Sequence, residues 1–209
     1  MLLKRRPIRR VVLEADERRE TVREFTMSDK DVERKLSFLD NGIAQVAIIV
    51  EDLEAAVESY WRWFGIGDWH FYTYGRPLLT KMTYGGQPGE YTMRVALSYL
   101  GPMRIELIEM VEGDTVYADF VEEHGYGVHH FGVLVEDMEK AIAQAQAAGL
   151  KVTMQGAGFG RDGDGHYAYL DTEDSLGVTI ELIERPRDRV PPEKIYPHKK
   201  KRPGEELDG

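Results

Sequence analysis

Two stretches of the chain repeat one pattern of apolar and polar positions. Residues 45–53 (Gln-Val-Ala-Ile-Ile-Val-Glu-Asp-Leu) align with residues 130–138 (His-Phe-Gly-Val-Leu-Val-Glu-Asp-Met). Each stretch is an apolar run that ends in Glu-Asp, which is typical of a strand followed by a helix whose first turn the Asp caps. The pattern therefore predicts strands at both places, with helices over 54–64 and 139–148.

A second pair of matching segments closes each half of this repeat. Residues 104–109 (Arg-Ile-Glu-Leu-Ile-Glu) and 179–184 (Thr-Ile-Glu-Leu-Ile-Glu) share five of six residues and alternate as strands do. The first half is longer, and the glycine-rich loop over 85–89 absorbs the difference. The sequence thus predicts an α+β protein built from two βαβββ modules that are related by a pseudo-twofold axis.

The repeat also sets the expected boundaries along the chain. The predicted parts are an N-terminal arm with a short helix (1–42), the first module (43–110), a linker or helix between the modules (111–126), the second module (127–185) and an extended C-terminal arm (186–209). The helix of the N-terminal arm is expected between Ser28, a good N-cap, and Leu39. Five prolines in the C-terminal arm argue against regular structure there.

Four polar residues occupy matched positions inside the predicted strands. Gln45 corresponds to His130, and Glu106 corresponds to Glu181, each Glu lying between Ile and Leu. Taken singly, each has an ordinary interpretation, because a strand Glu is usually solvated and a strand His is usually a core residue. If the modules pair about a twofold axis, however, all four converge on one sheet face. An amide, two carboxylates and an imidazole suit one divalent ion: Zn²⁺, Ni²⁺, Co²⁺, Mn²⁺ or Fe²⁺.

The motifs at 45–53, 104–109, 120–130 and 177–182 resemble the vicinal oxygen chelate superfamily. That superfamily includes glyoxalase I, methylmalonyl-CoA epimerase, extradiol dioxygenases and bleomycin-resistance proteins. The segment 120–130 (Phe-Val-Glu-Glu-His-Gly-Tyr-Gly-Val-His-His) is similar to methylmalonyl-CoA epimerases. The resemblance covers residues 43–185 and implies the glyoxalase-like fold, in which two modules form a curved mixed sheet around an open metal cleft.

Carried over position by position, the resemblance places the family's metal ligands at Gln45, Glu106, His130 and Glu181. Epimerases generally have His at the first of these positions, so Gln45 makes the set more similar to that of eukaryotic glyoxalase I. Extradiol dioxygenases need two His and one Glu around Fe²⁺, so Gln45 argues against ring cleavage. The bleomycin-resistance type has lost its ligands, so the complete set here argues against that type as well.

The resemblance implies a metal-dependent isomerase or lyase that moves a proton next to a carbonyl group through a metal-stabilised enolate. It makes Glu181 the first candidate for the catalytic base and Glu106 the second. Three alternatives stay open: an Fe(II) dioxygenase, a non-catalytic binding or resistance protein for a hydrophobic small molecule, and a structural partner protein.

Further candidates for substrate binding lie beside the predicted metal site. Trp69 and Phe71 fall on the strand after the first helix, where alternate side chains can line a pocket for an aromatic or hydrophobic substrate. Arg94 and Arg104 are among the basic residues placed to meet a substrate carboxylate or phosphate. His129 is expected on the opposite sheet face from His130, in a structural role.

Composition narrows the classes of partner. The net charge of −10 and the pI near 5.2 argue against nucleic acid and anionic membranes as partners. The chain has no cysteine, which excludes disulfides and thiolate zinc sites. No apolar run is long enough to span a bilayer, and residues 1–10 lack the apolar core of a secretory signal. We therefore expect a cytoplasmic protein with a small-molecule substrate, and the two arms favour a homodimer.

Overall fold

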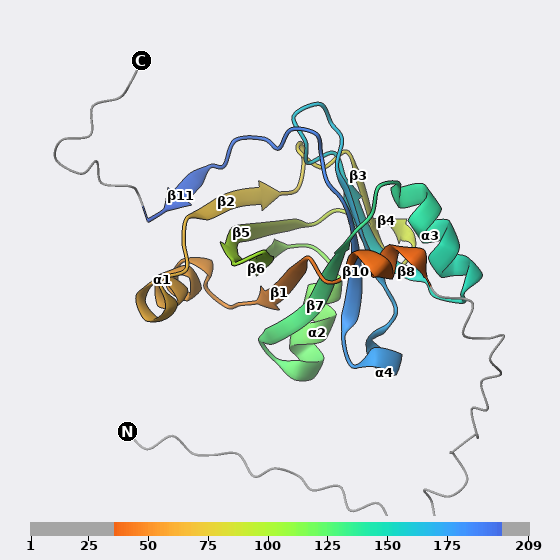
Figure 1. The fold of residues 1–209 in the computed structure, drawn as a ribbon, viewed down its shortest axis with the longest axis horizontal. Helices are drawn as coiled ribbons and strands as arrows, with labels where there is room; N and C mark the ends of the chain where they lie inside the picture. Colours follow the sequence, from red (N-terminus) through yellow and green to blue (C-terminus); the bar gives the residue numbers. More distant parts are fainter. Residues whose placement is uncertain (1–35, 198–209) are drawn as a thin grey trace, which may run out of the picture. The chain divides into compact units, whose positions relative to one another are not determined.

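The computed structural model of the chain describes residues 36–197, which form one mixed, curved sheet of eleven strands with helices on both faces (Figure 1). The strand order is β11-β2-β5-β6-β1-β7-β10-β9-β8-β3-β4. The strands are β1 (Gln45–Ile49), β2 (Trp69–Tyr74), β3 (Lys81–Tyr84), β4 (Gln87–Pro88), β5 (Thr92–Leu100), β6 (Met103–Glu112), β7 (Gly127–Leu134), β8 (Val152–Ala157), β9 (His166–Leu170), β10 (Thr179–Glu184) and β11 (Lys194–Tyr196). The helices are the 3-10 helix η3 (Ser37–Asn41) and the α-helices α1 (Leu53–Phe64), α2 (Val116–His124), α3 (Met138–Ala147) and α4 (Glu173–Leu176).

The sheet consists of two equivalent halves, which confirms the predicted fold class. Strands β2, β5, β6 and β1 with helix α1 make one half, and strands β7, β10, β9 and β8 with helix α3 make the other. In each half the first strand pairs in parallel with the last, β1 with β6 and β7 with β10. The halves join where β1 and β7 pair antiparallel.

Both predicted helix starts are capped as the repeated Glu-Asp pattern indicated. The Asp52 carboxylate accepts the backbone N–H of Ala55 at 2.8 Å, and the Asp137 carboxylate accepts that of Lys140 at 3.0 Å. Each bond satisfies one of the free N–H groups at the start of a helix. The same local sequence therefore builds the same strand-to-helix turn twice.

Each half carries an additional edge strand that comes from elsewhere in the chain. The glycine-rich loop of the first half folds into the β3–β4 hairpin, which pairs with β8 of the second half. Gly85 and Gly86 form its two-residue turn with φ of 57° and 76°, values that favour glycine at both positions. At the other edge, β11 pairs antiparallel with β2. Residues 194–196 thus form a strand despite the expectation for the proline-rich arm, because none of the three is proline.

The two faces of the sheet have different roles. One face packs against α1 through residues such as Trp69 and Leu107, and against α3 through residues such as Leu182. The opposite face, called here the cleft face, is covered in part by α2, whose Tyr117 is fully buried among other aromatic side chains. The polar positions of the repeat point toward the cleft face.

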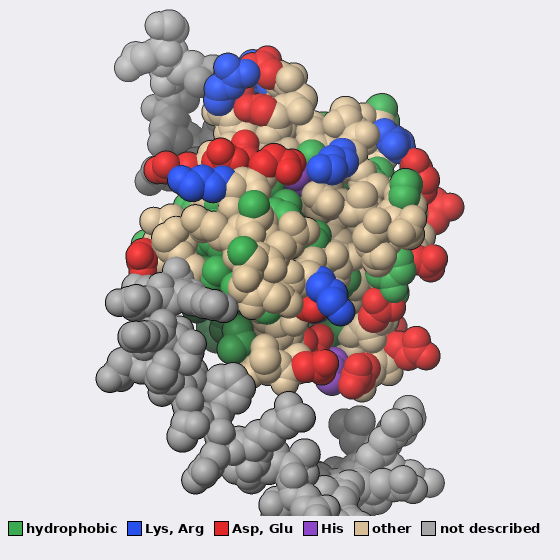
Figure 2. Space-filling model, turned by 90° about the vertical axis from the view of Figure 1, so that its right-hand side faces the viewer, with side chains coloured by type: hydrophobic (Ala, Val, Ile, Leu, Met, Phe, Trp, Pro, Cys, Tyr) green, Lys and Arg blue, Asp and Glu red, His purple; other side chains and the backbone are tan. Residues whose placement is uncertain are grey.

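Three expectations from the sequence concern the N-terminal helix, membrane-spanning segments and the charge of the surface. The helix expected between Ser28 and Leu39 falls mostly outside the described residues, whose first element is the short η3. No helix in the described part of the chain is long and apolar enough to cross a membrane. Figure 2 shows acidic side chains spread over the face it draws, with fewer basic ones between them, in agreement with the net charge of −10.

Candidate metal centre

The central strands of both halves bring four polar side chains to the cleft face. Gln45 begins β1, and His130 lies in β7 beside it. Glu106 lies in β6 and Glu181 in β10, the parallel neighbours of β1 and β7. The apolar residues on either side of each Glu pack on the helix-covered face, so both carboxylates point the other way. The structure therefore brings together all four positions that the repeat singled out.

Three of these side chains have the geometry of a metal-binding group. His130 Nε2 lies 3.1 Å from Glu181 Oε2 and 3.6 Å from Glu106 Oε2. One possible ligand atom from each of the three lies within 4.8 Å of the others. The exposed fractions are 0% for His130, 7% for Glu106 and 4% for Glu181. Two carboxylates and an imidazole held this closely, with almost no solvent, fit a divalent ion with mixed oxygen and nitrogen ligands.

The two carboxylates raise the pKa of the His130 imidazole. Burial alone would lower the pKa of His130, but Glu181 and Glu106 beside the ring raise that pKa to about 9. Without an ion, His130 is therefore protonated at neutral pH and balances part of the carboxylate charge. A divalent ion bound at Nε2 has to replace this proton, so metal binding here is coupled to proton release.

Gln45 joins the group with its amide nitrogen toward the carboxylates. Gln45 Nε2 donates to Glu106 Oε2 at 2.8 Å and to Glu181 Oε2 at 2.9 Å. The amide oxygen faces the other way, because Arg104 Nε donates a hydrogen bond to it. Arg104 is itself 6% exposed. The atom through which Gln45 would bind a metal, its amide oxygen, is thus engaged by Arg104.

His129 lies on the same side as His130, contrary to the expectation for a regular strand. The pairing of β1 with β7 shifts register there: Ala47 lies opposite His130, and Ile48 opposite Val128. This β-bulge turns His129 back toward α2 and the aromatic side chains. His129 Nδ1 lies 2.9 Å from His130 Nδ1, and burial, with His130 beside it, lowers the pKa of His129 to about 2. Neutral His129 can therefore accept the Nδ1–H of His130 and orient the ring, as second partners of metal-binding histidines do.

A pair of buried tyrosines supports the second carboxylate. Tyr169 donates its hydroxyl hydrogen to Glu181 Oε1 at 3.0 Å, and the hydroxyl groups of Tyr169 and Tyr117 are 2.6 Å apart. Burial raises the pKa of both tyrosines well above the usual value, so both hydroxyls stay protonated. The bond leaves Glu181 Oε2 free to face His130. The sequence holds no signal for this role of Tyr169, which reads there as an ordinary strand aromatic.

The cleft beside the metal-binding group is narrower than the open cleft that was expected. A cavity of about 20 Å³ borders Glu106 and Glu181, and it is also lined by Arg104 and Arg189. A second cavity of about 120 Å³ shares Arg104 and Arg189 with the first and extends to Tyr72. Arg189 belongs to the segment that follows β10, so the C-terminal arm narrows the opening.

The structure brings only one of the four predicted substrate-binding residues to the cleft. Trp69 and Phe71 are buried against α1 on the opposite face, and their alternate neighbours Tyr72 and Tyr74 point to the cleft face instead. The expected alternation exists, but the sequence alone did not distinguish its two faces. Tyr72 and Tyr74 are the other set of alternate positions in this strand, so the signal that pointed to Trp69 and Phe71 applied equally to them.

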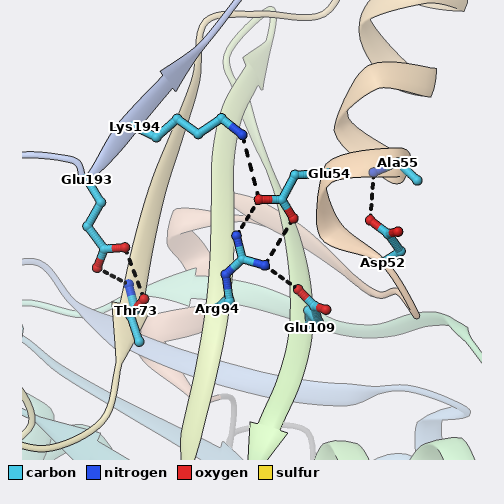
Figure 3. Close-up of polar contacts among 8 residues, drawn as sticks. All are labelled: Asp52, Glu54, Ala55, Thr73, Arg94, Glu109, Glu193 and Lys194. Carbon is cyan, nitrogen blue, oxygen red and sulfur yellow. Dashed lines mark hydrogen bonds and ion pairs between the residues drawn. The ribbon is translucent and has the colours of Figure 1, made fainter.

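Arg94 also lies away from the cleft, whereas Arg104 lies within it. Figure 3 shows the Arg94 guanidinium between Glu54 of α1 and Glu109 of β6, which it contacts at 2.8 Å through Nη1. Arg94 shares its face of β5 with Ala96, which packs against α1. Arg104 contacts Gln45 and borders both cavities. Arg189, which no motif marked, joins Arg104 there.

The sequence and the fold both have counterparts among known proteins. A profile of the glyoxalase/bleomycin resistance protein/dioxygenase superfamily matches residues 44–169. No curated protein matches the chain in sequence.

Three solved structures illustrate the structural likeness. A methylmalonyl-CoA epimerase in complex with methylmalonyl-CoA and NH4+ has a TM-score of 0.52 and 22% identity, over 71% of this chain and 97% of that one. Methylmalonyl-CoA epimerase from Mycobacterium tuberculosis has a TM-score of 0.50 and 23% identity, over 68% of this chain and 87% of that one. A variant of Streptomyces coelicolor methylmalonyl-CoA epimerase with 2-nitronate-propionyl-CoA has a TM-score of 0.52 and 22% identity, over 71% and 97%. At these identities the likeness shows the fold alone.

Proposed function

The chain belongs to the glyoxalase/bleomycin resistance protein/dioxygenase superfamily, and on that premise we propose that it is a metal-dependent isomerase or lyase that moves a proton next to a carbonyl group. The observation that carries the proposal is the buried group of Glu106, His130 and Glu181 in the cleft. Two carboxylates buried side by side are costly unless a cation balances them. A functional cation site explains why they are there.

Glu106, His130 and Glu181 would hold one divalent ion, with Zn²⁺, Ni²⁺, Co²⁺, Mn²⁺ and Fe²⁺ all compatible with their donor atoms. When bound, the ion would supply Lewis acidity that lowers the pKa of a C–H group beside a substrate carbonyl. Gln45 would be a fourth ligand if its amide turned and released Arg104; in the described orientation it instead positions the two carboxylates.

Glu181 is our first candidate for the base that takes the substrate proton, and Glu106 is the second. Both carboxylates border the small cavity in which a reacting carbon would have to lie. Tyr169 holds one oxygen of Glu181, which keeps the other oxygen directed at the group. A carboxylate in this place can accept the proton and return it to the same or a neighbouring atom.

Two substrate classes deserve the first trial. Acyl-CoA thioesters with an acidic α-C–H group are suggested by the methylmalonyl-CoA epimerases of similar fold. Hemithioacetals are suggested by the Gln, Glu, His, Glu set, which is similar to that of glyoxalase I. A ring-cleaving dioxygenase is less favoured, because the group contains one His and two Glu rather than two His and one Glu.

Metal content and proton exchange test the proposal together. The full chain is stripped with a chelator, reloaded with each ion separately, and incubated in D₂O with methylmalonyl-CoA or with a hemithioacetal. We expect about one ion per chain and deuterium incorporation next to the carbonyl of one substrate, detected by mass spectrometry. Absence of metal after reloading, or metal without exchange in either class, would overturn the proposal.

Matched Glu to Gln variants separate the role of each carboxylate. Glu181→Gln should abolish exchange, whereas Glu109→Gln, which lies in β6 on the face opposite Glu106, should keep it. Full turnover by Glu181→Gln with metal still bound would move the base to Glu106. A non-catalytic binding protein for a hydrophobic small molecule is the second candidate, favoured by the cavity of about 120 Å³ that Tyr72 and Leu97 line, and it predicts ligand binding without exchange and without need for a metal.

A further inference from the structure

The segment that follows β10 crosses the opening of the cleft and is fixed on both sides of it. We call residues 185–196 the C-terminal strap. On one side, the Asp188 carbonyl accepts the Arg161 N–H at 2.8 Å, and the Asp164 carboxylate accepts the Arg187 N–H at 2.8 Å. On the other side, Glu193 accepts the backbone N–H of Thr73 at 2.8 Å (Figure 3). The residues between these anchors are thereby held over the cleft.

Arg189 is the strap residue that enters the cleft. Its Nη1 donates a hydrogen bond to the Tyr74 hydroxyl. The centre of its guanidinium lies 5.4 Å from the centroid of the Tyr72 ring and 5.3 Å from that of Phe159, within the range of cation–π attraction. These three aromatic groups fix the guanidinium in place, and its other N–H groups donate to no side chain among the described residues.

Arg104 faces the same space from the opposite side. Arg104 and Arg189 both line the cavity of about 120 Å³, and both line the smaller cavity at Glu106 and Glu181. Among the described residues, no carboxylate forms an ion pair with either guanidinium, although the chain as a whole has a net charge of −10. The Asp68 carboxylate also lines the larger cavity, so two guanidinium groups face one carboxylate there, and a ligand that supplies a further anionic group would be favoured.

The charges in the cleft point to the sign of that ligand. With a divalent ion at the Glu106, His130 and Glu181 group, the two carboxylates are balanced by the ion. The two positive charges of Arg104 and Arg189 then exceed the single negative charge of Asp68 in the larger cavity. Phe159, Tyr72 and Tyr74 add an apolar wall, which favours a ligand with an anionic group on a flat or apolar body.

We infer that Arg189 and Arg104 form a binding site for an oxyanion of the substrate, a carboxylate or a phosphate, which the C-terminal strap completes. The inference rests on the proposed function in that it treats this cleft as the substrate site. Arg189 lies beyond residues 44–169, the part of the chain that the superfamily profile matches. The strap thus supplies a specificity residue that the two modules alone do not contain.

Binding of small aromatic probes tests this site without knowledge of the substrate. Benzoate carries a carboxylate, phenyl phosphate carries a phosphate, and benzamide has nearly the shape of benzoate without the charge. Dissociation constants are measured by calorimetry on the full chain, both metal-free and loaded with Ni²⁺. We expect one anion to bind at least about tenfold more tightly than benzamide, since a charged hydrogen-bond partner is lost in the amide. The preferred anion identifies the group as carboxylate or phosphate.

Variants of the strap decide whether Arg189 is responsible. Arg189→Gln should weaken binding of the preferred anion at least about tenfold and leave benzamide unchanged. Arg185→Gln removes the same charge from an exposed part of the strap and should leave both dissociation constants within about twofold, as expected for a screened surface charge. Arg189→Lys keeps the charge and should retain part of the binding, which excludes misfolding as the cause. Equal binding of anion by wild type and Arg189→Gln, or no preference for either anion over benzamide, would overturn the inference.

The result is separable from the test of the proposed function. Anion binding that depends on Arg189 in a chain that takes up no metal would leave this site standing and remove the isomerase or lyase. Metal uptake and proton exchange with no selective anion binding would support the isomerase or lyase and remove the anion site.

Discussion

The two halves of the sheet differ most where they meet at the metal-binding group. At matched positions the first half has Gln45 paired in register with Arg104, and the second half has His130 paired in register with Thr179. The first half thus contributes a neutral amide held by a cation, and the second contributes an imidazole whose in-register partner Thr179 is uncharged. A duplicated framework carries Glu106 and Glu181 symmetrically, while the remaining polar positions have separate roles. Metal binding should therefore depend more on the second half, and substrate recognition more on the first.

The largest expected effect is on metal affinity, when His130 of the second half is replaced by Gln, the residue at the matched position of the first half. His130→Gln removes Nε2 and the bond to His129, and it should lower metal affinity by about 100-fold or more, because loss of an outer partner alone already costs about 10- to 100-fold. Gln45→Ala removes only the amide that positions the carboxylates, and it should cost about tenfold. Titration with Co²⁺, followed by its absorption spectrum, measures both. Equal losses would show that Gln45 is a direct ligand and that the halves are functionally symmetric.

The next effect concerns one matched pair of small residues, Gly132 in β7 and Ala47 in β1. A Cβ at Gly132 would lie 2.6 Å from Ile183 Cδ1, 2.9 Å from Gln45 Cβ and 3.1 Å from Glu181 Oε2. Gly132→Ala should therefore lower the free energy of unfolding by about 1 to 3 kcal/mol and weaken metal binding. Ala47→Gly should cost about 0.5 to 1 kcal/mol and leave metal binding unchanged. Urea denaturation and metal titration of both variants check this, and equal metal affinities would contradict it.

The duplication could be predicted because it depends on local patterns in the sequence. Apolar alternation, the Glu-Asp caps and the matched Gln45, His130, Glu106 and Glu181 all depend on residues close together in the sequence. Period-two alternation in a strand assigns each side chain to a face, and symmetry then brings the four together. The fold class and the composition of the buried group follow from these signals.

The features that the sequence did not predict depend on contacts between segments that are distant in the chain. The pairing of the β3–β4 hairpin with β8 has no local signal, because strand pairing depends on which edge is available. The bulge at His129 likewise follows from the register between β1 and β7. Arg189 belongs to a proline-rich arm whose route over the cleft is set by Asp164 and Thr73, far away in sequence. Trp69 and Phe71 were assigned to the pocket because alternation alone does not say which face is covered by α1.

The pH dependence of the metal-free chain is a further test of the difference between the two halves, because Gln45 does not titrate and His130 does. The pKa of His130 is about 9 in the folded chain and near 6.5 in the unfolded one. Its ion pairs with the carboxylates therefore stabilise the fold fully below pH 6.5, and this contribution is lost as the pH rises toward 9. The loss is at most about 3 kcal/mol.

Urea denaturation of chelator-treated protein at pH 6.5 and 9, with NMR titration of the His130 ring, measures this loss. Loading with metal should reverse the trend, because the ion binds the deprotonated ring and its affinity rises over the same interval. A His130 ring that titrates below pH 6.5 in the metal-free chain would show that the two carboxylates do not act on it as described.

The smallest expected effect comes from the arginine of the first half that faces away from the cleft. Arg94 is paired with Glu54 and Glu109, and its side chain is 35% exposed. Solvent screens such pairs, so Arg94→Gln should lower the free energy of unfolding by about 0.5 to 1 kcal/mol and leave metal affinity and anion binding as in the wild type. Arg104→Gln is the matched variant on the cleft face, and it should reduce anion binding and free the Gln45 amide. Urea denaturation with metal and benzoate titrations separates the two. If Arg94→Gln reduced anion binding as strongly as Arg104→Gln, both faces of the first half would contribute to recognition, and the division of roles between the halves would have to be redrawn.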